Sequence, residues 1–200
     1  AAMPPSRSIY RSEQGRRAIE DFCRRTLADS GVPLRTRFVE TMQGRTHLAE
    51  AGPDDGAVLL LLHGSASNSA AWLGDVPLWS REFRVIAADI PGHPGLSEAR
   101  SLVLAGEATA SWLQSLLDAV GVEAVRMVGM SLGAWAALDY ASREPDRVRA
   151  VSLLSPSGLV PARRSFLVKA LPLALLGDWG SDRIQRMVFG GAEVPEPVLE

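Results

Sequence analysis

The stretch Gly129-Met130-Ser131-Leu132-Gly133 decides the fold, because of the sequence on either side of it. Residues 124–128 form a short apolar run that is typical of a buried strand, and residues 132–144 have a helical pattern. A serine between two glycines at such a junction indicates a sharp turn, in which strand and helix crowd together and only small residues fit. Such a turn strains the backbone and lifts the Ser131 hydroxyl out of the sheet. A simpler interpretation is that Ser131 only caps the helix.

Outward from this turn, strand and helix patterns alternate along the chain. Strands are predicted at 58–62, 83–88, 124–128 and 148–154, and helices at 69–79, 104–120 and 132–144. This alternation predicts right-handed crossovers and a parallel sheet. Before it, an amphipathic helix is predicted at 12–30, followed by two strand-like runs at 34–41 and 45–50 with a turn at Gln43-Gly44. The sequence therefore predicts an α/β fold with a mixed, mostly parallel sheet of at least six strands.

Composition excludes several classes of protein. The chain has 200 residues, of which 46% are hydrophobic and 22% charged, as in ordinary globular domains. Its formal net charge of −2 gives no electrostatic reason to expect a nucleic-acid partner. The only lysine, Lys169, is not preceded by glycine, so the chain has no Walker A loop. Cys23 is the only cysteine and lies on the apolar face of the predicted helix 12–30, where we expect a small core residue.

The last part of the chain breaks the alternating pattern. Two helices are expected at 163–176, which is rich in leucine, and at 181–189, with no strand after them. We therefore expect a lead-in at 1–11, a core at 12–158 and a helical segment from 159 to 200. No apolar run is long enough to span a membrane, and arginines stand where a signal peptide would need an apolar core. A cytoplasmic protein with no membrane association is expected.

The sequence resembles the α/β-hydrolase superfamily, in particular its carboxylesterase-like members. The resemblance extends from Leu34 to Leu159. It is carried by the following pieces in this order: Leu62-His63-Gly64-Ser65, Asp89-Ile90-Pro91-Gly92-His93 with Ser97, Gly129 to Gly133, and Pro145-Asp146-Arg147-Val148. The family fold implies helices on both faces of the sheet, with residues from about 159 onward forming the start of a cap over the pocket.

The resemblance implies a serine hydrolase that cleaves carboxylic esters through an acyl-enzyme. Ser131 would be the nucleophile, with Gly129 and Gly133 forming the elbow around it. The backbone N–H groups of Ser65 and Leu132 would form the oxyanion hole. The substrate would be a small-molecule ester with an apolar group, because the cap segment is rich in leucine. No cofactor and no metal is expected, and His47 with Glu50 is too sparse a pair for a metal site.

The sequence departs from the family pattern in its histidines. The family triad runs serine, acid, histidine along the chain, whereas His47, His63 and His93 all precede Ser131. We expect His63 to form a turn, Asp89 to fix the loop after its strand, and His93 to be a loop residue. By comparison with the family, the last two strands, with the acid and the histidine, are absent.

Three explanations are open for the missing triad members. The chain is an N-terminal portion whose base and acid lie in a segment beyond residue 200, or it is a degenerate hydrolase, or His93 replaces the base. We expect the first, and expect the 200 residues alone to be inactive. Two other functions are carried forward, namely a non-catalytic ligand-binding module and a hydrolase of lactone, amide or carbon–carbon bonds. The natural substrate and the oligomeric state are not predicted.

Overall fold

A computed structural model describes residues 8–99, 106–159, 164–173 and 175–188. Contacts divide the chain into two compact units, Ala1–Leu159 and Val160–Glu200. The first unit contains the following elements: α1 (Glu13–Ala28), β1 (Arg35–Thr41), β2 (Gly44–Ala51), β3 (Ala57–Leu62), η1 (Ser69–Trp72), α2 (Val76–Trp79), β4 (Phe83–Ala88), α3 (Glu107–Ala119), β5 (Val125–Met130), α4 (Leu132–Arg143), η2 (Pro145–Arg147) and β6 (Val148–Leu154). The second unit contains α5 (Arg164–Leu173) and α6 (Gly177–Val188).

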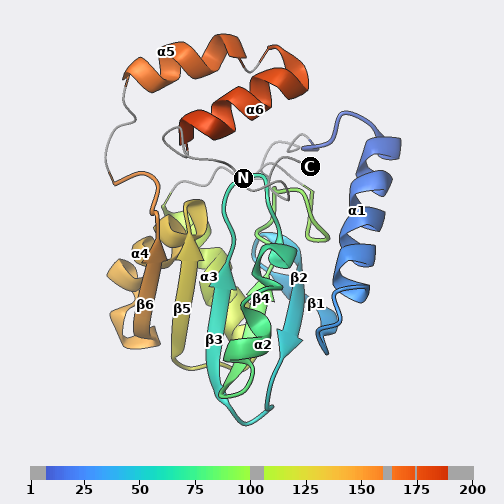
Figure 1. Cartoon of the computed structure of the whole chain (residues 1–200). Coiled ribbons are helices and arrows are strands. Elements are labelled where there is room, and N and C mark those ends of the chain that lie inside the picture. Colours follow the sequence, from blue (N-terminus) through green and yellow to red (C-terminus); the bar gives the residue numbers. More distant parts are fainter. Residues whose placement is uncertain (1–7, 100–105, 160–163, 174, 189–200) are drawn as a thin grey trace, which may run out of the picture. The chain divides into compact units, whose positions relative to one another are not determined.

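The first unit is built on one mixed sheet, as predicted. Within the described residues this sheet has six strands in the order β1-β2-β4-β3-β5-β6 (Figure 1). Strand β3 pairs in parallel with β4 and β5, and β5 pairs in parallel with β6. Strand β2 pairs antiparallel with β1 on one side and with β4 on the other. The carboxyl ends of β3, β4, β5 and β6 therefore meet at the same edge of the sheet. Ligands bind at this edge in open α/β folds.

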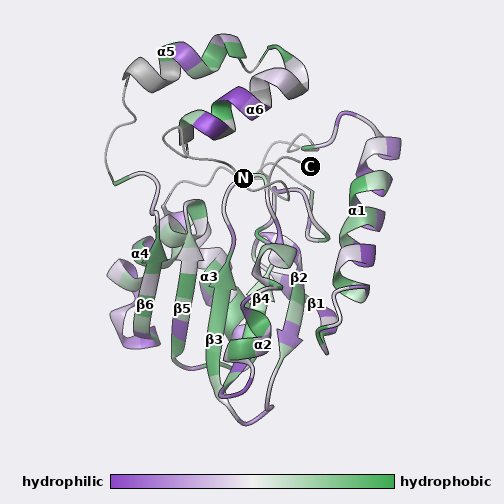
Figure 2. Cartoon of the chain, viewed as in Figure 1, coloured by the Kyte–Doolittle hydropathy of each residue, from purple (hydrophilic) through white to green (hydrophobic). Residues whose placement is uncertain are grey.

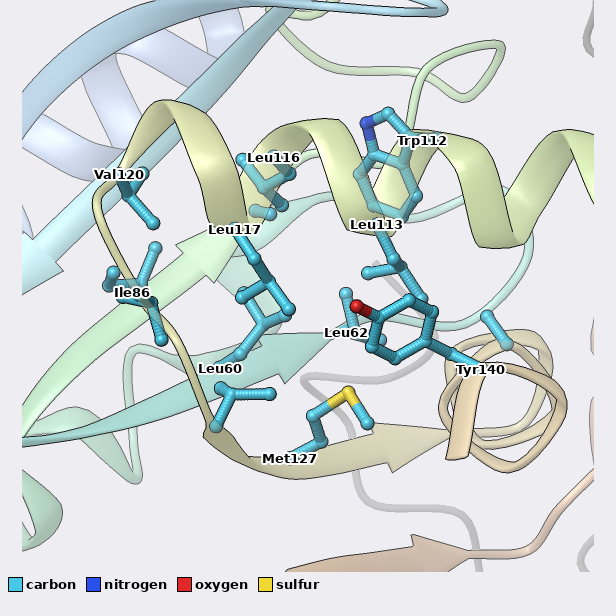
Figure 3. Packing of buried hydrophobic residues seen from close by; sticks show 14 of the residues in the cluster. Leu60, Leu62, Ile86, Trp112, Leu113, Leu116, Leu117, Val120, Met127 and Tyr140 are labelled. Carbon is cyan, nitrogen blue, oxygen red and sulfur yellow. The ribbon is translucent and has the colours of Figure 1, made fainter. Parts of the chain in front are cut away.

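Strand β3 is buried on both faces, which explains its uninterrupted apolar sequence. Successive side chains point to opposite faces of a strand. Leu60 and Leu62 pack with Trp112 of α3 and Tyr140 of α4 in one core (Figure 3). Leu59 and Leu61 pack with residues of α1, η1 and α2 in the other. Figure 2 shows the hydrophobic colour along this central strand. Helices on both faces thus hold β3 and the turn that follows it in a fixed place.

Helix α1 is stabilised by a capping serine and by apolar side chains that it buries against the sheet. The Ser12 hydroxyl accepts a hydrogen bond from the Gly15 N–H at 3.0 Å and so caps its N-terminus. Cys23 and Leu27 are buried in the core on the α1 side of the sheet, as expected for Cys23. The Cys23 sulfur also accepts a hydrogen bond from the Asn68 side chain at 3.4 Å. The helix therefore packs beside the loop between β3 and η1.

Other expectations need correction or extension. Residues 69–79 do not form one helix but two short ones, η1 and α2, because Gly74 interrupts the pattern and Pro77 supports only a new first turn. Helix α6 begins at Gly177, earlier than expected, and Leu104 lies outside the described residues. Within the expected lead-in, the Ile9 N–H donates to the Ala99 carbonyl at 2.9 Å. In the described part of the chain, no helix is long and apolar enough to cross a membrane.

Candidate active site

Ser131 lies in a strained turn between β5 and α4. Its backbone angles are φ 51° and ψ −108°, which residues other than glycine rarely adopt. Its N–H donates to the Leu154 carbonyl at 2.9 Å, and its carbonyl accepts from the Trp135 and Ser157 N–H groups. These bonds tie the turn to α4 and to the end of β6. The Ser131 side chain makes no capping hydrogen bond to α4, so the geometry does not support the simpler interpretation of a capping serine.

Close packing explains the two glycines around Ser131. A Cβ atom at Gly129 would lie 2.4 Å from the Gly133 carbonyl oxygen. A Cβ atom at Gly133 would lie 2.1 Å from the Leu62 carbonyl oxygen. Both distances are far below van der Waals contact, and the atoms that would be hit are backbone atoms. Strand β5, helix α4 and the end of β3 therefore approach each other as the sequence pattern requires.

The two N–H groups expected to bind an oxyanion lie on the segments next to Ser131. Leu132 is the first residue of α4, so its N–H has no acceptor within the helix. Ser65 follows β3, which is paired with β5 up to Leu62 and Gly129. A Cβ atom on the neighbouring Gly64 would lie 3.5 Å from the Ser131 Cβ. The start of α4 also carries the positive end of the helix dipole, which favours negative charge at this place.

His63 is a structural residue, as its geometry indicates. Its side chain is fully buried, and its Nε2 accepts a hydrogen bond from the Ile90 N–H at 2.8 Å. Nδ1 must then carry the proton, which it donates to the Gly64 carbonyl at 2.7 Å. Burial lowers the pKa of His63 to about 4. The ring is neutral at pH 7 and has no free nitrogen with which to take a proton from Ser131.

His93 is also engaged by the backbone. Its Nδ1 accepts a hydrogen bond from the Ala66 N–H at 3.2 Å, and its ring packs edge-to-face on His63 with centroids 5.7 Å apart. Because Nδ1 is an acceptor, the neutral ring carries its proton on Nε2. This arrangement leaves no lone pair for a proton from Ser131 and does not support His93 as the base. No histidine in the described ranges is hydrogen-bonded to the Ser131 hydroxyl.

Asp89 does more than fix the loop after its own strand. One carboxylate oxygen accepts from the Leu96 N–H at 2.8 Å, within that loop, and the other accepts from the Ser69 N–H at 2.7 Å, at the end of the loop after β3. His47 of β2 places its Nδ1 3.2 Å from the carboxylate, and both side chains are buried. Burial alone would raise the pKa of Asp89, but these partners outweigh it and lower the pKa.

The part played by His47 is the feature that sequence reasoning missed. The backbone N–H of His47 donates to the Ser97 hydroxyl at 2.8 Å, and this hydroxyl donates to the backbone carbonyl of Asp89 at 2.7 Å. The available signal was a lone polar residue in the middle of a buried strand, since such a residue needs a buried partner. No group of three or more His, Cys, Asp or Glu residues in the described part of the chain could hold a metal ion.

Comparisons with known proteins show which family and which solved structures this chain is similar to. The family model for the alpha/beta hydrolase fold matches residues 57–186. An uncharacterized carboxylesterase, nap, of Bacillus subtilis is 33% identical over 143 residues, which cover 71% of this chain and 48% of that protein. The carboxylesterase YbfK of the same organism is 33% identical over 120 residues, covering 60% of this chain and 40% of that protein.

The crystal structure of carboxylesterase CesB (YbfK) from Bacillus subtilis is similar to this chain with a TM-score of 0.80 and 26% identity. The similarity covers 92% of this chain and 64% of that one. In sequence, the chain matches less than half the length of each of the two curated relatives.

Proposed function

Because this chain belongs to the α/β-hydrolase family, we propose that it carries the nucleophile of a serine hydrolase that cleaves carboxylic esters through an acyl-enzyme on Ser131. One observation carries the proposal: Ser131 is held at φ 51° in the turn after β5 and makes no capping bond. A serine that served only to cap α4 would avoid this strain. The two relatives are named as carboxylesterases, which supports the ester as substrate.

The reaction begins with attack of the Ser131 Oγ on the ester carbonyl carbon. The new Oγ–C bond pushes the π electrons of the carbonyl onto its oxygen, and the Ser65 and Leu132 N–H groups stabilise this oxyanion. Each such donor is worth about 3 kcal/mol of barrier. Collapse of the tetrahedral intermediate breaks the bond to the alcohol oxygen, which receives the proton that left Ser131. Water then hydrolyses the acyl-enzyme by the same steps.

A general base must accept the Ser131 proton, because a serine hydroxyl is a weak nucleophile without one. The nitrogens of His63 and the Nδ1 of His93 are already engaged by backbone groups. The His47 Nδ1 faces Asp89. We therefore place the base and its acidic partner in a segment beyond residue 200. We also propose that the segment after Leu159, with its helices α5 and α6, begins a cap whose apolar side chains favour an apolar acyl or alcohol group.

The test uses the full-length protein and its Ser131→Ala variant. Treatment with a fluorophosphonate should add one adduct to the wild-type protein, on Ser131, as measured by intact mass and peptide mapping. The variant should show no adduct, and its hydrolysis of p-nitrophenyl butyrate should fall by about 10⁴-fold or more. Retained hydrolysis in the variant would exclude Ser131 as the nucleophile. Saturable ester binding without an adduct or turnover in the wild type would instead indicate a ligand-binding module.

One relative gives reason to test a second class of substrate. A 2-hydroxy-6-oxo-6-phenylhexa-2,4-dienoate hydrolase of Burkholderia cepacia is 30% identical over 122 residues. A panel of esters, lactones, amides and this dienoate, assayed with the same two proteins, separates the possibilities. The substrate class of the enzyme is the one for which the wild type has the highest kcat/KM and Ser131→Ala has no activity.

A further inference from the structure

The loop after β3 is held at three points, and all three partners belong to the segment that follows β4. At its start, the His63 Nε2 accepts from the Ile90 N–H. At its middle, the Ala66 N–H donates to the His93 Nδ1. At its end, the Ser69 N–H donates to the Asp89 carboxylate. The segment from Asp89 to His93 therefore sets the position of a loop that belongs to a different strand.

The middle contact is the one next to the proposed oxyanion donor. Ala66 follows Ser65 directly and has φ 55°, a left-handed conformation that costs free energy for alanine. The bond to His93 fixes the plane of the Ser65–Ala66 peptide. The Ser65 N–H belongs to the preceding Gly64–Ser65 peptide, which meets the Ser65–Ala66 peptide at the Ser65 Cα. Fixing the plane of the Ser65–Ala66 peptide therefore restricts the direction of the Ser65 N–H. Without His93, we expect Ala66 to relax toward negative φ and the Ser65 N–H to turn with it.

His93 is suited to accept this bond. Its partly exposed ring packs edge-to-face on the buried ring of His63, which fixes its orientation. Burial lowers its pKa, which favours the neutral ring, and only the neutral ring can accept at Nδ1. The two outer contacts hold the ends of the loop. The His93 contact is the only one of the three that reaches its middle.

We propose that His93 is a positioning residue of the oxyanion hole: by accepting the Ala66 N–H, it aims the Ser65 N–H at the oxygen on which charge develops. The proposal rests on the proposed serine-hydrolase function. A donor that is misdirected stabilises the transition state less, while the substrate, whose carbonyl carries little charge, binds almost as before. His93 therefore acts on kcat and leaves KM nearly unchanged.

The test compares two substitutions of His93 in the full-length protein. His93→Phe keeps a ring against His63 and removes the acceptor, whereas His93→Asn places an oxygen close to the position of Nδ1. With p-nitrophenyl butyrate we expect kcat to fall about 30-fold in His93→Phe, with KM within about threefold of wild type. His93→Asn should restore kcat to within about threefold of wild type. If His93→Phe melts at a lower temperature than wild type, His93→Leu replaces it.

A transition-state analogue tests whether the loss of kcat reflects weaker binding of the transition state. The inhibition constant of a trifluoromethyl ketone should rise in proportion to the fall in kcat. The matched control is Tyr10→Phe. It removes a hydroxyl that lies 3.4 Å from the backbone nitrogen and 3.5 Å from the carbonyl oxygen of Gly95, two residues after His93, and it leaves Ala66 untouched. Its kcat should equal that of the wild type.

The outcomes distinguish the two proposals. A wild-type protein with neither an adduct on Ser131 nor turnover would overturn the proposed function itself. An active wild type with unchanged kcat in His93→Phe would overturn the positioning role alone. Equal losses in His93→Phe and Tyr10→Phe, or a loss in His93→Asn as large as in His93→Phe, would also overturn it, because the acceptor atom would then not be responsible.

Discussion

The turn after β5 and the loop after β3 end neighbouring strands at the same edge of the sheet, yet different interactions hold them. The turn is held by close backbone packing, since Gly129 and Gly133 leave no room for a Cβ, and by strain at Ser131. The loop is held by buried polar side chains. His63, at the start of the loop itself, accepts from the Ile90 N–H, and Asp89, which follows β4, accepts from the Ser69 N–H at the end of the loop.

This difference determines how each region responds to change. A region held by close packing fails when an atom is added, and pH has little influence on it. A region held by buried polar groups fails when a partner is lost or changes its protonation state, because an unpaired buried polar group costs free energy. The four predictions below separate these two behaviours.

The largest effect is expected where a methyl group is added to the turn. Gly133→Ala places a carbon within about 2 Å of the Leu62 carbonyl oxygen, so helix and strand must move apart. We expect a loss of about 3 kcal/mol or more in the free energy of unfolding, measured by urea denaturation. Gly74→Ala is the matched control, because a Cβ there meets nothing within 4 Å, and it should change stability by less than about 0.5 kcal/mol. Equal effects of the two substitutions would show that packing does not define the turn.

The next effect is a pH dependence that belongs to the loop. The pKa of His63 falls from 6.5 to about 4 on folding, so the unfolded chain binds the proton first as the pH drops. The neutral His63 ring contributes about 3 kcal/mol to the free energy of unfolding. This contribution is fully present above pH 6.5 and is lost as the pH falls from 6.5 to about 4. His63→Gln retains an acceptor and does not titrate. Its free energy of unfolding should therefore fall less over this range, and parallel curves for the two proteins would contradict the prediction.

A smaller effect is expected from Asp89→Asn. The substitution removes the charge and leaves the Ser69 and Leu96 N–H groups to share one amide oxygen, which should cost about 2 kcal/mol at pH 7. Because folding lowers the pKa of Asp89, its contribution is present above the ordinary value of 3.8 and is lost as the pH falls further. Below that value the variant and the wild type should converge in chemical denaturation. The control is Asp55→Asn, because Asp55 is exposed. An equally large loss of unfolding free energy in the control would show that the effect of Asp89→Asn does not depend on burial.

The smallest effect tests the strain at Ser131. Glycine adopts φ 51° and ψ −108° more readily than any residue with a Cβ. Ser131→Gly should therefore be more stable than Ser131→Ala by about 1 kcal/mol, although we expect neither variant to turn over substrate. Thermal melts of the two variants measure this difference. Equal melting temperatures would mean that the turn stores no strain.

Sequence reasoning predicted what depends on neighbours along the chain. The strands, their order along the chain and the turn at Ser131 follow from local periodicity and from glycine spacing, and the structure has all of them. Residues 69–79 were wrongly predicted as one helix, because Gly74 and Pro77 break a pattern that is apolar enough to look continuous. The roles of Ser65, Leu132 and Ser131 in catalysis stay predictions.

Tertiary structure alone decided which side chains hold the loop after β3. His47 lies in β2, whereas Asp89 and Ser97 lie in the segment after β4, and nothing in the sequence indicates that His47 shares a buried network with these two residues. The same is true of His93 and Ala66, which are 27 residues apart. The sequence by itself determined the turn, because steric exclusion acts between residues that the chain already places side by side. The polar network needed the folded sheet, because its energy arises only when strands far apart in the chain exclude water around the same carboxylate.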